Sequence, residues 1–233
     1  MHISYGHGRS SGADLPAVLG TQDMKVAVTG FTSFPGVDLN ISETLVHNWI
    51  RSAPNWKADA TRFEVLPTAY DDSRLCISNL IETFRPHILV MLGVAGISST
   101  LQFERIALNI DDCVSPDIHG IVKMGRRIAD HGPAAILTAV DLDRLREYVI
   151  RKKIDVQVSN HAGTYVCNHA YYCALLSVAS LHPQPQILFV HLPNGLGIVG
   201  DAQWNEIIQR CQGAVEVMVN GLLEITGTHF GGR

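Results

Sequence analysis

The sequence predicts an α/β protein, in which helices cover both faces of a mostly parallel central sheet in a single-domain three-layer α/β/α sandwich. Short β-rich runs alternate with helical stretches along the chain from Met24 onward. Two of these runs, residues 87–96 and 186–192, are almost continuously apolar, which is typical of central strands covered on both faces. A length of 233 residues suits one domain of this kind.

Residues 1–23 are expected to form a flexible leader, because they are rich in Gly, Ser and His and lack the apolar centre of a signal peptide. A single domain is then expected at residues 24–233. Its strands are expected at residues 25–30, 61–68, 87–96, 103–112, 155–160 and 186–192. Its helices are expected at residues 42–50, 71–84, 141–153, 167–182 and 202–226.

Each of these elements has local support in the sequence. The first strand ends in a turn at Gly30, and Ser42 offers a capping hydroxyl to the first helix. The second helix is capped near Asp71 and ends before Pro86, which cannot continue it. The helix at 141–153 is amphipathic, with basic residues in its last turn. Residues 113–133 give only weak signals, so no element is expected there.

Composition and cysteine usage limit the partners and the compartment. The net charge of -4 comes without a block of lysine or arginine, so nucleic acid is not expected as a partner. No apolar run approaches the roughly 20 residues that a membrane span needs. The five cysteines are scattered, odd in number and free of CxxC pairs, which argues against disulfides and structural zinc. A reducing cytoplasm is therefore the expected compartment.

Three chemically active side chains lie near the ends of predicted strands. Cys167 follows the strand at 155–160 through the turn HAGTY, His191 lies at the end of the last strand, and Glu104 comes shortly after the run at 87–96. In parallel α/β sheets, active sites lie beyond the carboxyl ends of the strands. We therefore expect a thiol, an imidazole and a carboxylate at the same edge of the sheet.

These three residue types fit nucleophilic catalysis. A thiol with a pKa of about 8.5 is only slightly ionised at neutral pH, and the thiolate is the nucleophile. Cys167 is expected in the first turn of a helix, where unpaired N–H groups favour a negative charge. His191 is placed to hold the proton, Glu104 to fix the histidine tautomer, and Gly163 to allow the tight turn that exposes the sulfur.

Each of these residues also has a purely structural interpretation. Cys167 could be a small buried hydrophobe, and His191 could serve only as a partner for a carbonyl group. Glu104 could form a surface ion pair with Arg105 or Arg127. These interpretations stay open at the level of sequence.

Metal and phosphate binding are disfavoured by residue spacing. His161 and His169 flank Cys167, but their spacing matches no standard zinc site and no second cysteine pair accompanies them. The glycine-containing stretches TGFTSFPG at 29–36 and GVAGIS at 93–98 lack the patterns that bind phosphate. No metal is therefore expected.

Four stretches, in this order along the chain, carry a family resemblance. They are VAVTGFTSFPGVDLN at residues 26–40, FERIALN at 103–109, SNHAGTYVCN at 159–168 and FVHLP at 189–193. The second fits the pattern E-[KR]-x-A-x-N and the third fits S-x-x-A-G-x-[FY]-x-C-N. Together the four resemble the motifs of the pyroglutamyl-peptidase I family (pyrrolidone-carboxyl peptidases), and the similarity covers nearly all of the chain from Met24.

The resemblance implies a cysteine-type omega peptidase that removes an N-terminal pyroglutamyl residue from peptides. It implies no metal or cofactor, and a homotetramer in the cytoplasm. Cys167 is then the nucleophile, His191 the general base and later acid, and Glu104 the residue that orients the histidine. A thioester would form at Cys167 and be hydrolysed by water, with the oxyanion met by the Cys167 N–H.

The same resemblance suggests how the substrate ring is bound. Phe34 and Tyr165 match the two aromatic positions that enclose the lactam, which suits a flat and uncharged ring. Phe31 and Asn40 belong to the same first-strand motif and are expected to contribute to the substrate site as well.

The chain departs from the family around the expected pocket. After Gly93 the family typically reads Q-A-G-G-R, whereas this chain reads VAGIS at 94–98, and Gln102 replaces a Ser or Thr. The missing arginine removes a fixed cation near the carboxylate. Three alternatives therefore stay open: another amide hydrolase with shifted specificity, a non-catalytic binding module, and a layered α/β enzyme that handles nucleosides or phosphate.

Overall fold

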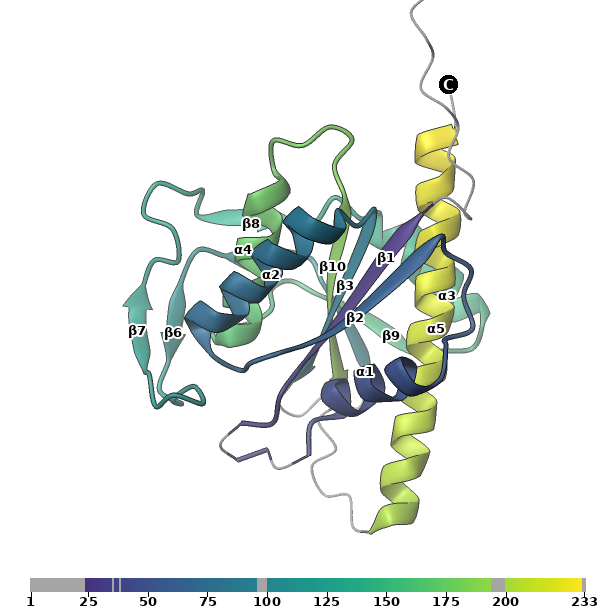
Figure 1. Ribbon diagram of the computed structural model, residues 1–233, viewed down its shortest axis with the longest axis horizontal. Coiled ribbons are helices and arrows are strands. Elements are labelled where there is room, and N and C mark those ends of the chain that lie inside the picture. Colours follow the sequence, from purple (N-terminus) through teal and green to yellow (C-terminus); the bar gives the residue numbers. More distant parts are fainter. Residues whose placement is uncertain (1–23, 35, 38, 96–99, 194–199, 232–233) are drawn as a thin grey trace, which may run out of the picture.

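The computed structural model describes residues 24–34, 36–37, 39–95, 100–193 and 200–231. Its centre is a six-stranded sheet with the order β2-β1-β3-β10-β4-β9, and helices cover both faces (Figure 1). The six strands are β2 (Ala60–Leu66), β1 (Lys25–Phe31), β3 (Ile88–Ala95), β10 (Gln186–Pro193), β4 (Leu101–Glu104) and β9 (Val156–Ser159). The predicted three-layer α/β/α architecture is confirmed. The expected leader at 1–23 lies outside the described residues.

The four strands β2, β1, β3 and β10 are mutually parallel, and they form the larger part of the sheet. β4 pairs antiparallel with β10, and β9 pairs parallel with β4. The inner strands β1 and β10 are buried along almost their whole length, as their apolar sequences predict.

Within the described residues, five helices form the outer layers: α1 (Ile41–Arg51), α2 (Tyr70–Phe84), α3 (Leu142–Arg151), α4 (Val166–Val178) and α5 (Asp201–Gly231). The Asn40 side chain caps α1 by accepting from the Ser42 N–H, and Asp141 caps α3 in the same way through the Arg144 N–H. The helix expected over 167–182 ends earlier, at Val178, and a turn leads on to the last strand. No helix in the described ranges is both long and apolar enough to cross a membrane.

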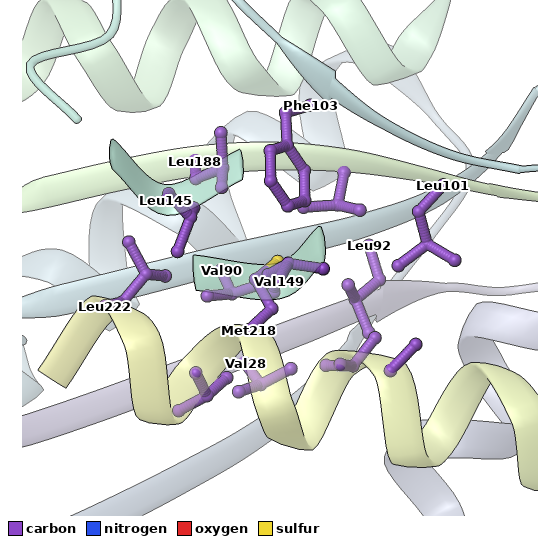
Figure 2. Packing of buried hydrophobic residues seen from close by; sticks show 14 of the residues in the cluster. Val28, Val90, Leu92, Leu101, Phe103, Leu145, Val149, Leu188, Met218 and Leu222 are labelled. Carbon is purple, nitrogen blue, oxygen red and sulfur yellow. The ribbon is translucent and has the colours of Figure 1, made fainter. Parts of the chain in front are cut away.

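The apolar core has one layer on each face of the sheet. Side chains of α1, α3 and α5 pack on one face, and those of α2 and α4 pack on the other. In the first layer, Met218 and Leu222 of α5 and Leu145 and Val149 of α3 converge on the strand residue Val90 (Figure 2). Full burial of one such side chain contributes roughly 1.5–3 kcal/mol, so these contacts fix the long C-terminal helix against the sheet.

The sequence prediction is wrong between residues 101 and 137. The single strand expected at 103–112 is divided among β4, β5 (Ile106–Leu108) and β6 (Asp111–Cys113). β5 pairs with β8 (Ala135–Leu137), which the sequence did not indicate, and β6 pairs with β7 (Lys123–Arg126).

The division occurs because the backbone changes partners at Arg105. The Arg105 N–H donates to the Ser159 carbonyl in the central sheet, whereas the Arg105 carbonyl accepts from the Thr138 N–H beside β8. The alternation of apolar and polar side chains continues across Arg105, so the sequence pattern cannot show that the backbone changes its pairing partner there. The β6–β7 pair, the teal segments at the left of Figure 1, extends beyond α2 and α4 as an arm.

Candidate active site

A buried histidine and a buried glutamate form the centre of the site. His191 lies near the end of β10 and Glu104 is the last residue of β4, and these strands are neighbours in the sheet. The antiparallel register places Glu104 opposite Phe189, two residues before His191, so that both side chains lie on one face. His191 Nδ1 donates to Glu104 Oε1 at 2.6 Å, because a carboxylate can only accept. His191 Nε2 is thereby left for a second partner.

The interpretation of Glu104 as part of a surface ion pair is wrong. Glu104 is 1% exposed and His191 is 6% exposed, so their contact is shielded from water. Arg127 instead donates through Nη2 to the Gly132 carbonyl. A carboxylate buried in this way acts on the imidazole with little screening.

Cys167 supplies the third group from the first turn of α4, which begins at Val166. Its side chain is partly exposed and lies close enough to His191 to raise the pKa of the imidazole. The thiol fits because the neighbouring strand residue is Gly93. A Cβ at that position would lie 3.0 Å from Cys167 Sγ and 2.8 Å from Phe189 Cζ. The structure thus brings thiol, imidazole and carboxylate together in one series, in which the imidazole and the carboxylate are hydrogen-bonded.

This series raises the pKa of His191 to about 9. Burial lowers the pKa, because an imidazolium loses hydration, but the hydrogen bonds and charges of Cys167 and Glu104 outweigh that effect. The imidazolium is therefore favoured at neutral pH. A protonated histidine beside a cysteine is the arrangement that a thiolate nucleophile requires.

The directions of the strands that carry the three groups differ from those expected. Sequence reasoning placed them all beyond the carboxyl ends of parallel strands, but β4 and β9 run opposite to β10. Glu104 therefore enters from a reversed strand, and the chain after β9 must turn back to reach Cys167. Gly163, at φ +78°, allows this turn, and the Thr164 hydroxyl anchors it to the Asp112 carbonyl at 2.7 Å.

Two aromatic side chains face each other near Cys167. The ring centroids of Phe34 and Tyr165 are 6.0 Å apart at an interplanar angle of 54°. The Tyr165 hydroxyl donates to the Pro116 carbonyl at 2.8 Å, and Tyr70 meets the Tyr165 ring edge-on at 5.8 Å. Both Phe34 and Tyr165 are partly exposed, so they offer apolar surface to a ligand next to the thiol.

The other two expected substrate-binding residues have structural roles instead. Phe31 is 2% exposed and packs against Phe189 in the core, so it presents no surface to a ligand. Asn40 Oδ1 accepts from the Ser42 N–H and hydroxyl, and Asn40 Nδ2 donates to the Thr32 carbonyl. The Asn40 side chain is therefore occupied as a helix cap. The first-strand motif shapes the loop that carries Phe34 rather than touching the substrate through these two residues.

Sequence reasoning missed two residues that support the position of Cys167. Gly93 provides space for the sulfur, which only the contact with α4 reveals. Asn168 accepts from the Leu108 N–H through Oδ1 and donates through Nδ2 to the Leu108 and Ile110 carbonyls, which fixes the start of α4. The signal for Asn168 was its place directly after Cys167 in the cysteine signature. Of the unusual VAGIS stretch, residues 96–98 lie outside the described ranges.

Comparisons with known proteins show the family to which this chain belongs. The profile of the family described as "Pyroglutamyl peptidase" matches residues 24–203. The pyrrolidone-carboxylate peptidase of Bacillus velezensis is 32% identical over 171 residues, which cover 73% of this chain and 79% of that protein. The corresponding peptidase of Thermococcus kodakarensis is 33% identical over 172 residues, with coverages of 73% and 81%.

Solved structures give the same result at the level of the fold. The crystal structure of Bacillus amyloliquefaciens pyroglutamyl peptidase I matches with a TM-score of 0.76 at 27% identity, covering 87% of this chain and 98% of that one. A mutant pyrrolidone carboxyl peptidase from the hyperthermophile Pyrococcus furiosus matches with a TM-score of 0.76 at 26% identity, with coverages of 87% and 100%.

Proposed function

Because this chain belongs to the pyroglutamyl peptidase family, we propose that it is a cysteine peptidase that hydrolyses the amide bond after an N-terminal pyroglutamyl residue. The observation that carries the proposal is the grouping of Cys167 beside His191, with His191 hydrogen-bonded to buried Glu104. A non-catalytic relative would be expected to keep its cysteine buried, with the histidine out of reach. Here the thiol is partly exposed and close enough to the imidazole to raise its pKa, which supports catalysis.

The first half of the reaction forms a thioester. The Cys167 thiolate attacks the carbonyl carbon exocyclic to the lactam ring, and the Cys167 backbone N–H at the start of α4 meets the developing oxyanion. The bond from that carbon to the leaving nitrogen then breaks. His191 donates its Nε2 proton to the departing amine, while Glu104 holds the Nδ1 proton in place.

The second half of the reaction releases the product. Neutral His191 takes a proton from water, and the resulting hydroxide attacks the thioester carbon. The carbon–sulfur bond breaks, giving free pyroglutamate, and the proton returns to the Cys167–His191 pair. Glu104 stabilises the imidazolium in both halves, so its contribution is electrostatic and orienting throughout.

Ring selection is assigned to Phe34 and Tyr165. A pyroglutamyl ring is flat and uncharged, so aromatic faces bind it by dispersion and desolvation rather than by charge. The facing arrangement of these two rings beside Cys167 supports this assignment. With the lactam held by these two aromatic rings, the exocyclic carbonyl group of the substrate would lie next to the Cys167 thiol.

We also propose that the protein acts in the cytoplasm as a homotetramer, with residues 24–233 as one domain. All five cysteines are free, which suits a reducing compartment. The arm between β6 and β7 carries exposed apolar side chains, and such clusters mark contact surfaces between protein chains. These side chains are Val114, Ile118, Ile121, Val122 and Met124. Light scattering after size exclusion tests the assembly, and a monomer at working concentration would contradict it.

The activity is tested with three fluorogenic 7-amino-4-methylcoumarin amides, carrying pyroglutamyl, prolyl and glutamyl groups. We expect release from the pyroglutamyl amide alone, and complete loss of release in Cys167→Ser. Cys173→Ser is the matched control, because Cys173 lies on the same helix but burial raises its pKa to about 12. This control should retain wild-type activity.

The other outcomes of this assay separate the alternatives. If all three amides remain intact while iodoacetamide still alkylates Cys167 at neutral pH, the specificity has shifted to another acyl group. If Cys167 reacts only after denaturation, the protein is a non-catalytic relative. Either result contradicts the proposed activity.

A further inference from the structure

A second buried pair of histidine and carboxylate lies close to the site. His169 is on α4, two residues after Cys167, and Asp111 is on β6. His169 Nδ1 donates to Asp111 at 2.9 Å to Oδ2 and 3.1 Å to Oδ1, and the two side chains are 3% and 1% exposed. Lys123 Nζ lies 3.6 Å from Asp111 Oδ2. The proposed reaction does not use this pair, although burying ionisable groups carries a large desolvation penalty.

The pair is connected to the substrate-facing ring by direct contacts. The His169 ring meets Tyr70 edge-on, with centroids 5.4 Å apart, and Tyr70 meets Tyr165 edge-on at 5.8 Å. The His169 N–H also donates to the Tyr165 carbonyl at 3.0 Å, as the first hydrogen bond of α4. His169 therefore supports Tyr165 both through its backbone and through an intervening ring.

Tyr70 is anchored at its backbone by Asp117, whose Oδ2 accepts the Tyr70 N–H at 3.2 Å, and its ring is held by packing. It is fully buried, and neither its hydroxyl nor His169 Nε2 has a hydrogen-bond partner in the described part of the chain. Lys123 Nζ lies 4.5 Å from the centroid of the Tyr70 ring. Because no hydrogen bond within the described residues holds the Tyr70 hydroxyl, packing sets the orientation of the ring. The apolar layer of α2 and α4 surrounds it, and its polar neighbours include the His169 ring and Lys123. Asp111 fixes both of these groups at once.

We propose that Asp111 and His169 are positioning residues for Tyr165, which they hold in place through Tyr70 so that its ring meets the lactam of the substrate. The pair then governs affinity for the ring and leaves the reactivity of Cys167 unchanged. This inference rests on the proposed function, because it takes Tyr165 as a wall of the lactam site. It adds residues that touch neither substrate nor nucleophile through their side chains.

Two substitutions of His169 distinguish the contribution of its N–H donor from that of its ring. His169→Asn keeps an N–H donor toward Asp111 but removes the ring that contacts Tyr70. His169→Phe keeps a ring but removes the donor, which leaves Asp111 with Lys123 as its cation. His47→Gln on α1 is the control, because this exposed histidine lies far from the pair in the fold. Circular dichroism establishes that each variant is folded.

Three readouts distinguish a role in positioning Tyr165 from a role in the reactivity of Cys167. They are the inhibition constant of free 2-pyrrolidinone, the split between KM and kcat for the pyroglutamyl amide, and the rate at which iodoacetamide alkylates Cys167. For His169→Asn we expect the inhibition constant and KM to rise about 3- to 10-fold, the equivalent of one lost aromatic contact. The alkylation rate should stay within about twofold of wild type. His169→Phe should recover part of the affinity, and His47→Gln should change nothing.

An unchanged inhibition constant in a folded His169→Asn protein would overturn the inference. A fall in the alkylation rate of Cys167 as large as the loss of affinity would also overturn it, because the pair would then act on the nucleophile instead of on Tyr165. If the His169 variants do not fold, Tyr70→Leu breaks the same connection without exposing the pair, and it must weaken 2-pyrrolidinone binding to a similar extent. Failure of wild type itself to bind 2-pyrrolidinone and cleave the amide would instead refute the proposed function.

Discussion

Glu104→Gln removes one charge from the triad while keeping the size of the side chain. In the native protein Glu104 accepts from His191 Nδ1 at 2.6 Å in a site that excludes water. Glutamine offers the imidazole either a weaker neutral acceptor or an N–H donor. The donor would favour the opposite tautomer, in which Nε2 carries the proton and can no longer accept one from Cys167.

The size of the effect follows from the pKa of His191. A change from about 9 to the ordinary 6.5 corresponds to roughly 3 kcal/mol, at about 1.36 kcal/mol per pKa unit. Cys167 and Glu104 both raise the pKa of His191, so loss of the Glu104 charge removes only part of this stabilisation of the imidazolium. Loss of the correct tautomer adds to this. We expect kcat to fall about 10²- to 10⁴-fold while KM changes by less than about threefold.

The assay is steady-state hydrolysis of the pyroglutamyl amide across the neutral and alkaline range. In wild type, kcat/KM should trace a bell whose limbs belong to the Cys167–His191 pair as a whole. The alkaline limb should lie near pH 9 and move to lower pH in Glu104→Gln, because the imidazolium is less favoured. A folded variant with kcat within about threefold of wild type would refute the role assigned to Glu104.

Three further predictions concern packing and stability. Gly93→Ala should reduce the alkylation rate of Cys167 and abolish hydrolysis, because the new Cβ would lie 3.0 Å from the sulfur; unchanged alkylation would contradict this. Asp117→Ala should lower the free energy of unfolding by about 1–3 kcal/mol in urea titrations, since buried Asp117 accepts three backbone N–H groups, including the first of α2; an unchanged midpoint would count against it. The raised pKa of His191 should stabilise the fold fully below about pH 6.5, its unfolded value, and this contribution should disappear as pH rises through about 9. A free energy of unfolding that is equally pH-dependent in Glu104→Gln would contradict the assignment to His191.

The sequence predicted those parts of the fold that depend on local pattern. Strands β3 and β10 followed from uninterrupted apolar runs, because a strand covered on both faces needs apolar residues at every position. The helix at 141–153 followed from its amphipathic period. Glu104, Cys167 and His191 could be singled out because each belongs to a motif with a chemically meaningful residue type. Their mutual contacts then depended on the sheet bringing β4 beside β10.

Features that arise from long-range contacts could not be read from the sequence. The reversal of β4 was hidden because strand direction is a property of pairing rather than of composition. Phe31 and Asn40 looked like substrate contacts, but burial and helix capping use them. His169 was considered only as a metal ligand beside Cys167, since its partner Asp111 is 58 residues away in the chain.

The most direct test of Cys167 as the nucleophile is intact mass spectrometry of the enzyme, acid-quenched during turnover of a pyroglutamyl ester. If Cys167 is the nucleophile, we expect a mass increase equal to one pyroglutamyl group. Peptide mapping should locate it to Cys167, and it should be absent from Cys167→Ser. The adduct should accumulate in wild type and disappear when substrate is exhausted. Turnover without an adduct on Cys167, or an adduct on another residue, would contradict the assignment of Cys167 as the nucleophile.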